Sequence, residues 1–366
     1  MTIVNERSAE DSAGRLDPPD ASAFRALAHR MLDDALDGLA AVSAGPAWRP
    51  VPAAVKAALA EDVPTEPEPL ANVYAEYRAL IEPYATGNRH PRFFGWVHGN
   101  GTPSGIVAEL LAAALNANVG GREQSAVYVE RAVIAWSAQL FGFPATASGI
   151  LTSGTSLANL IAVVVARRAV LGEDVRSAGL RAAPLTAYAS AAVHRCVPAA
   201  FDIAGLGSAA LRRIVTDAAG RIDCAALRTT IVADRAAGLT PFMVVATAGS
   251  VDTGAVDDLA ALADLCAAEG LWLHVDGAFG ALAILSPQHR SLLRGIERAD
   301  SLAFDFHKWL HVPYDAGCVL IRDPHQPHQS SGNRRRSRRD PRGDRRDRSA
   351  PRGRRCRGAV ACLTMC

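Results

Sequence analysis

The sequence predicts an α/β protein with a mostly parallel sheet and helices on both of its faces. Between residues 148 and 321, short apolar runs alternate with helical patterns at about the spacing of βαβ units. Two of these runs end in an acid, Asp276 and Asp305, as strands do when they deliver side chains to the carboxyl edge of a sheet. A length of 366 residues with 49% hydrophobic residues is ample for a large core.

Residues 1–100 are expected to form a helical N-terminal segment. Phe24, Leu27 and Met31 recur at helical spacing, and proline-rich stretches at 46–52 and 64–69 interrupt the pattern. An apolar stripe of this kind belongs either to the core of the chain or to an interface with a partner, and the sequence leaves both alternatives open.

Residues 101–323 are expected to form the large α/β domain. Within it, residues 149–160 read as a strand, a tight turn and a helix that opens with Thr155 and Ser156. Backbone N–H groups, the helix dipole and two hydroxyls at a helix start suit a phosphate group. Ser and Thr are also the usual helix-capping residues, which is the alternative explanation of the same pattern.

Lys308 is one of only two lysines, with Lys56, in a chain that carries 39 Lys plus Arg. Only lysine can lose its proton and form a Schiff base with a carbonyl, so its retention here indicates a chemical reason rather than a surface charge. Asp276 ends an apolar run 32 residues earlier. An amine and a carboxylate on two strand ends are the two fixed points that pyridoxal phosphate requires, the second for its pyridinium nitrogen.

The segments 274–278 (HVDGA) and 305–310 (DFHKWL) resemble the cofactor signatures of the group II pyridoxal-phosphate decarboxylases, the family of aromatic amino acid, glutamate and histidine decarboxylases. Residues 312–317 (VPYDAG) resemble a bacterial branch of that family, and the resemblance runs from about residue 88 to residue 323. It implies a fold-type I enzyme that is a homodimer, in which the N-terminal segment wraps the partner subunit.

The resemblance also assigns the site. It implies that Lys308 holds the cofactor as a Schiff base, that Asp276 bonds its ring nitrogen and that His194 stacks on the ring, where an imidazole also suits proton transfer. These three are the catalytic candidates. The expected cofactor-binding residues are Thr155, Ser156, His194, Ser250, Asp276, Asp305, His307 and Lys308.

The expected reaction is decarboxylation of an L-amino acid to an amine and CO₂. The same groups would serve an aminotransferase or an aldolase-type lyase, so only the resemblance favours decarboxylation. Residues 127–130 (VYVE) stand where better-known members have a Thr-Glu-Leu-Glu run, and the substrate therefore stays open. The family continues with a mobile loop and a small C-terminal domain that this chain is expected to lack, so an inactive truncated remnant is a further alternative.

Residues 324–366 form an arginine-rich tail that is expected to be disordered. Residues 331–366 hold 13 Arg and 3 Asp, which leaves 26 basic and 34 acidic groups in the other 330 residues. We interpret the tail as the product of a shifted reading frame in a GC-rich gene. A basic arm that binds nucleic acid is the alternative, which the acidic body of the chain does not support.

The remaining patterns concern location. The seven cysteines are scattered and include no Cys-x-x-Cys pair, so neither a disulfide framework nor a metal site is expected. The first residues lack the pattern of a secretory signal, and no apolar run approaches about 18 residues, so no membrane association is expected. The sequence therefore predicts a cytoplasmic enzyme.

Overall fold

The computed structural model describes residues 17–120, 123–180 and 184–323. The chain divides into two compact units, residues 1–94 and 95–366. The arginine-rich tail at 324–366, which was expected to be disordered, lies outside the described residues.

The first unit is helical over most of its described length. Its helices are α1 (Ala21–Ala41), α2 (Ala53–Ala58) and α3 (Leu70–Glu76), and α3 runs on into short π and 3-10 segments, Tyr77–Ile81 and Glu82–Tyr84. The Asp20 side chain accepts hydrogen bonds from the N–H groups of Ser22 and Ala23 and so caps α1. Tyr74 ties α3 to α1 by donating its hydroxyl to Asp34 at 2.6 Å.

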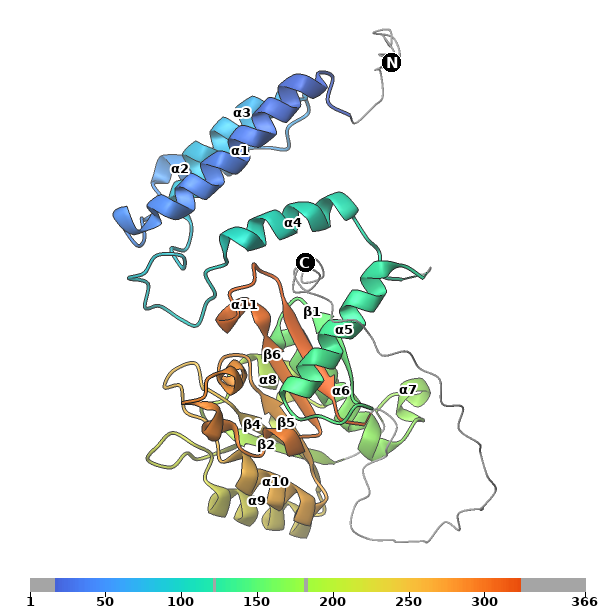
Figure 1. Ribbon diagram of the computed structural model, residues 1–366. Helices are drawn as coiled ribbons and strands as arrows, with labels where there is room; N and C mark the ends of the chain where they lie inside the picture. The colour runs from blue at the N-terminus through green and yellow to red at the C-terminus, as the bar shows by residue number, and fades with distance from the viewer. Residues whose placement is uncertain (1–16, 121–122, 181–183, 324–366) are drawn as a thin grey trace. The chain divides into compact units, whose positions relative to one another are not determined.

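The second unit is built around a seven-stranded sheet (Figure 1). The strands are β1 (Ser148–Thr152), β2 (Leu185–Ser190), β3 (Leu211–Ile214), β4 (Thr240–Thr247), β5 (Trp272–Asp276), β6 (Ser301–Asp305) and β7 (Gly317–Ile321). They lie in the order β1-β7-β6-β5-β4-β2-β3. The five strands from β6 to β3 are parallel, whereas β7 is antiparallel to both of its neighbours. A mostly parallel sheet was predicted, and the prediction is confirmed.

The described residues of the second unit also form eight α-helices. They are α4 (Pro103–Leu115), α5 (Ser125–Leu140), α6 (Thr155–Leu171), α7 (Val175–Ala178), α8 (Cys196–Ile203), α9 (Cys224–Ala236), α10 (Leu259–Glu269) and α11 (Phe306–Trp309). Capping residues define several ends. Asp223 and Asp258 accept from backbone N–H groups at the starts of α9 and α10, and Gly270 ends α10 in the left-handed conformation.

The two faces of the sheet bury separate hydrophobic cores. Along β4, Val244 and Ala246 contribute to the core under α5, α9 and α10, while Met243 and Val245 contribute to the core under α6 and α8. Successive side chains of a strand point to opposite faces, so a strand buried on both faces is apolar without alternation. Helices therefore cover both faces, as predicted from the sequence.

Gly317, the first residue of β7, brings two turns together at the carboxyl edge. It pairs with Thr152 at the end of β1 and with Asp305 at the end of β6. A Cβ on Gly317 would lie 2.6 Å from the Cα of Gly154 and 2.8 Å from a carboxylate oxygen of Asp305. The absence of a side chain thus lets the turn before α6 approach the end of β6.

Candidate active site

A cavity of about 820 Å³ opens at the carboxyl edge of the sheet, and all of the predicted site residues line it. They come from the start of α6, from the turns after β2 and β4, from the ends of β5 and β6, and from the short helix α11 that follows β6. The residues are Thr155, Ser156, His194, Ser250, Asp276, Asp305, His307 and Lys308. Lys308 and Asp276 follow neighbouring parallel strands, as the sequence indicated.

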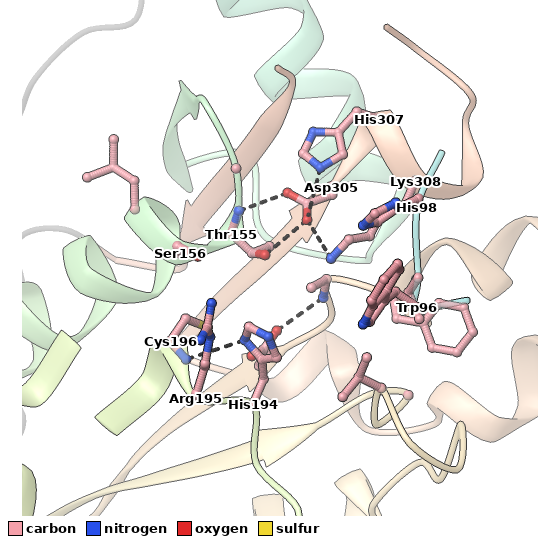
Figure 2. A pocket seen from close by; sticks show the side chains of 18 of the residues that line it. Trp96, His98, Thr155, Ser156, His194, Arg195, Cys196, Asp305, His307 and Lys308 are labelled. Carbon is pink, nitrogen blue, oxygen red and sulfur yellow. Dashed lines mark hydrogen bonds and ion pairs between the residues drawn. The ribbon is translucent and has the colours of Figure 1, made fainter. Parts of the chain in front are cut away.

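The Asp305 carboxylate is the centre of a hydrogen-bonded cluster (Figure 2). It accepts from the backbone N–H of Thr155 at 2.8 Å and from the Thr155 hydroxyl at 3.0 Å. The Lys308 ammonium lies 2.9 Å from the same carboxylate, which is 2% exposed. Both donors of Thr155, which the sequence analysis assigned to a cofactor phosphate, are thus engaged with a carboxylate of the chain itself.

His307 is buried beside this cluster. Its Nδ1 accepts from the backbone N–H of Ala316 at 3.0 Å, so the ring proton lies on Nε2, which is 3.5 Å from the Asp305 carboxylate. Burial lowers the pKa of His307, with the charge of Asp305 acting in the opposite direction. Tyr314 packs on the imidazole at 4.2 Å between ring centroids.

Asp276 lies at the end of β5 and is 5% exposed. Burial raises the pKa of its carboxyl group, and hydrogen bonds from the Ala278 N–H at 3.2 Å and the Asn159 amide at 3.1 Å oppose that rise. A nearby cation would favour the ionised form further. The carboxylate therefore suits a protonated ring nitrogen.

His194 is exposed to the cavity and lies on the turn after β2 (Figure 2). Its Nδ1 accepts from the backbone N–H of Cys196 at 3.3 Å, which leaves the proton on Nε2. An imidazole whose Nδ1 is fixed by this hydrogen bond therefore lines the cavity.

The two serines of the predicted set differ in their surroundings. Ser156 is exposed at the start of α6. Ser250 is buried, and its hydroxyl lies 2.7 Å from that of Thr253 and accepts from the N–H of Ala255. Ser250 thus holds the turn after β4 in shape at the cavity wall.

Sequence reasoning missed several residues at this site. Thr247 lines the cavity, and its hydroxyl is buried without a hydrogen-bond partner among the described residues. Trp96 and Tyr314 form aromatic parts of the wall, and Asn159 lies behind Asp276. Thr247 ends an apolar strand just as Asp276 does, so the same strand-end signal would have found it.

These features fit a pyridoxal phosphate site. The cavity supplies an amine, a buried carboxylate, an imidazole and a helix N-terminus, and the Thr247 hydroxyl lacks the partner that a bound molecule would provide. The parallel sheet with these groups at its carboxyl edge defines a fold-type I pyridoxal phosphate enzyme.

The chain belongs to a family of such enzymes. Residues 52–334 match the family described as the pyridoxal-dependent decarboxylase conserved domain. Its relatives include an aromatic-L-amino-acid decarboxylase of Bacillus atrophaeus, 44% identical over 238 residues, and an L-2,4-diaminobutyrate decarboxylase of Rhizobium meliloti, 38% identical over 236 residues. Each of these alignments covers 64% of this chain, and it spans 48% of the first relative and 46% of the second. The chain thus spans about half the length of these relatives.

Solved structures agree with the fold. The tryptophan decarboxylase of Catharanthus roseus in complex with L-tryptophan matches with a TM-score of 0.77 at 29% identity, over 84% of this chain and 68% of that one. The predicted resemblance to pyridoxal phosphate decarboxylases and the cofactor are therefore confirmed. Within the described residues, no helix is long and apolar enough to cross a membrane, and no cluster of three or more potential metal ligands occurs.

Proposed function

We propose that this chain carries the cofactor site of an enzyme that decarboxylates an L-amino acid to an amine and CO₂. One observation carries the proposal: the Lys308 amine and the Asp276 carboxylate line the same cavity from the ends of neighbouring parallel strands. The matched family and the named relatives support the reaction. Pyridoxal phosphate, when bound, links to amines as a Schiff base and withdraws electrons from the bond that breaks.

Lys308 supplies the amine. Its Nζ is held 2.9 Å from Asp305, and its side chain is 19% exposed, so it is both oriented and accessible from the cavity. Before it reacts with a carbonyl, the ammonium must give up a proton, and the Asp305 carboxylate lies within hydrogen-bond distance of that proton.

Asp276 and His194 are the residues that would hold the cofactor ring. Asp276 is buried, and its carboxylate would hold a bound cofactor by accepting a hydrogen bond from a protonated ring nitrogen. His194 presents its Nε2–H to the cavity, where its imidazole would hold one face of a bound ring. Because its Nδ1 is engaged with the Cys196 N–H, the imidazole stays in one orientation while it donates from Nε2.

Anion binding falls to the groups around the start of α6. Ser156 offers a hydroxyl there, and His307 offers its Nε2–H beside Asp305. Because the two donors of Thr155 already bond the Asp305 carboxylate, Thr155 contributes by fixing that carboxylate. A phosphate would then be held by Ser156, His307 and the positive end of the helix dipole.

Spectroscopy tests the cofactor assignment. The purified chain mixed with pyridoxal phosphate should show a visible absorption band that borohydride abolishes, leaving the cofactor covalently attached. Lys308→Ala should lose both the band and the attachment. Lys308→Arg is the matched control, because it keeps a cation beside Asp305 but cannot form a Schiff base. No band in a folded wild-type protein would refute the proposal.

Product analysis tests the reaction. A panel of L-amino acids, including aromatic ones and L-2,4-diaminobutyrate because relatives are named for them, should yield an amine and CO₂ from at least one member. Formation of a keto acid would instead indicate an aminotransferase. Cleavage of a β-hydroxy amino acid to an aldehyde would indicate an aldolase-type lyase.

We also propose that the enzyme is a cytoplasmic homodimer. Four large apolar residues of α4 are 41% to 58% exposed and recur at helical spacing, which suits an interface with a second copy: Val107, Leu110, Leu111 and Leu115. The cysteines among the described residues are free thiols, which a reducing compartment preserves. Light scattering of the purified chain and fractionation of expressing cells test the two statements.

A further inference from the structure

Behind Asp276, four side chains form a continuous buried line of hydrogen bonds. The Asn159 amide donates to Asp276 at 3.1 Å, and the Asn159 carbonyl oxygen lies 2.8 Å from Nε2 of His274. Nδ1 of His274 lies 2.8 Å from the hydroxyl of Ser301, which also accepts from the indole N–H of Trp272 at 2.8 Å. Asn159, His274 and Ser301 have no exposed surface.

The donor-to-acceptor order of these hydrogen bonds is set at Trp272, the residue farthest along the line from Asp276. The Trp272 indole can only donate, so the Ser301 oxygen accepts from it, and the Ser301 proton is free to go to Nδ1 of His274. His274 then carries its proton on Nε2 and donates to the carbonyl oxygen of Asn159. The Asn159 amide nitrogen is thereby turned toward Asp276, which accepts.

If every donor and acceptor in the line were exchanged, the hydrogen bonds near Asp276 would still be satisfied, but those at Ser301 would not. A protonated Asp276 would donate to a flipped Asn159 amide, which would donate to Nε2 of His274, whose Nδ1 would donate to Ser301. The Ser301 oxygen would then accept twice, and no other bond of its hydroxyl exists among the described residues. A buried hydroxyl proton without an acceptor is unfavourable.

We propose that Trp272, Ser301, His274 and Asn159 are positioning residues that form a one-way chain of hydrogen bonds, which keeps Asp276 ionised and aimed into the cavity. Trp272 selects the direction, and the other three residues transmit it over three further bonds. Asn159 is doubly fixed, because its amide nitrogen also lies 3.4 Å from the Cys196 sulfur. The value of an ionised Asp276 for a bound ring rests on the proposed function, whereas the chain of bonds does not.

The protonated nitrogen of His274 reports the direction without any cofactor. Nitrogen NMR of the full chain, with labelled histidine, should show His274 neutral and protonated on Nε2 across about pH 5 to 8, because burial lowers its pKa to about 3. His274→Gln assigns the signal by removing one of ten histidines. A proton on Nδ1, or a charged ring at neutral pH, would overturn the proposal.

Two variants test the origin of the direction. Trp272→Phe removes the terminal donor and Ser301→Ala removes the group on which it acts, so each should convert a single His274 form into a mixture of both. Tyr188→Phe is the matched control. It deletes a hydroxyl buried in the same sheet, bonded to Asp234 at 2.9 Å, and should leave His274 unchanged. An unchanged His274 in a folded Trp272→Phe or Ser301→Ala variant would refute the role of Trp272.

The test of the hydrogen-bond chain and the test of the proposed function can succeed or fail independently. A chain that binds no pyridoxal phosphate but holds His274 protonated on Nε2 retains the proposal and loses the proposed function. A chain that binds the cofactor with His274 protonated on Nδ1 does the reverse.

Discussion

Adding a methyl group at Gly317 should separate the two turns that form the centre of the site. The Cβ of Gly317→Ala would lie 2.6 Å from the Cα of Gly154 and 2.8 Å from Asp305 Oδ1. Carbon atoms in contact lie about 3.5–4.0 Å apart, so the turn before α6 must retreat by about 1 Å. The Thr155 donors, now 2.8 and 3.0 Å from the carboxylate, would then pass beyond hydrogen-bond distance.

The expected loss in the free energy of unfolding is about 3 kcal/mol. Overpacking of a well-packed interior costs about 1–3 kcal/mol, and a hydrogen bond to a charged group contributes about 1.5–3 kcal/mol. These terms overlap, because a turn that moves relieves the collision while it breaks the bonds. Affinity for pyridoxal phosphate should fall as well, since Asp305 also holds Lys308.

Urea unfolding followed by circular dichroism measures the change, with Gly154→Ala as the matched control. A methyl on Gly154 would meet its nearest atom, Cε1 of His307, at 3.5 Å, which is an ordinary contact. The two variants place the same methyl on opposite sides of one close approach. Equal stabilities for Gly317→Ala and Gly154→Ala would refute the steric reasoning.

Three further substitutions give separate tests. Thr247→Val should leave the unfolding free energy of the cofactor-free chain within about 1 kcal/mol of the wild type, because the hydroxyl has no partner among the described residues, yet it should weaken cofactor binding in a spectroscopic titration. Burial lowers the pKa of His274 to about 3, below its unfolded value of about 6.5, so the unfolded chain gains a proton first as the pH falls. The free energy of unfolding linked to His274 should therefore drop by about 1.4 kcal/mol per pH unit below pH 6.5, or by about 2 kcal/mol at pH 5. Urea unfolding at pH 6.5 and at pH 5 measures this drop, and the contribution should be missing in His274→Gln. Asp257→Asn should cost about 2 kcal/mol in thermal or urea unfolding, because both carboxylate oxygens accept buried backbone N–H groups, of Ile222 and Thr247, at 2.7 Å; an unchanged stability would contradict this.

The parts of the site that sequence predicted are those carried by a local signal. Asp276 and Lys308 each follow a short apolar run, and parallel strands bring their carboxyl ends to one edge. The alternation of apolar runs with helical patterns likewise indicated a parallel sheet with helices on both of its faces. These inferences need only chain-local periodicity and the general rule for open parallel sheets.

The parts that sequence missed depend on contacts between distant positions. Asn159 lies in the second turn of α6 and looks like any polar residue of a helix, yet it meets His274, 115 residues away. Thr155 bonds Asp305, 150 residues away, and no local pattern indicated that contact, while its expected role toward a phosphate stays a prediction. Neither partner can be identified until the strand order is known. That order, with β7 between β1 and β6, is not encoded in any local pattern.

The place of β7 also constrains how the chain is synthesised and folds. Among the described strands, β1 joins the rest of the sheet only through β7. The residues of β7 pair with positions about 165 residues earlier, such as Thr152 with Gly317. While the chain is being translated, β1 lacks its partner strand, and α5 lacks the part of its packing surface that β7 provides, until residue 321 has left the ribosome. Closure of such a distant pairing is slow and exposes apolar strand edges meanwhile. Expression at lower temperature or with chaperones should therefore raise the soluble yield. A chain that ends before residue 317 lacks β7, so β1 and β6 should not be joined and the carboxyl edge of the sheet at the cavity should not form.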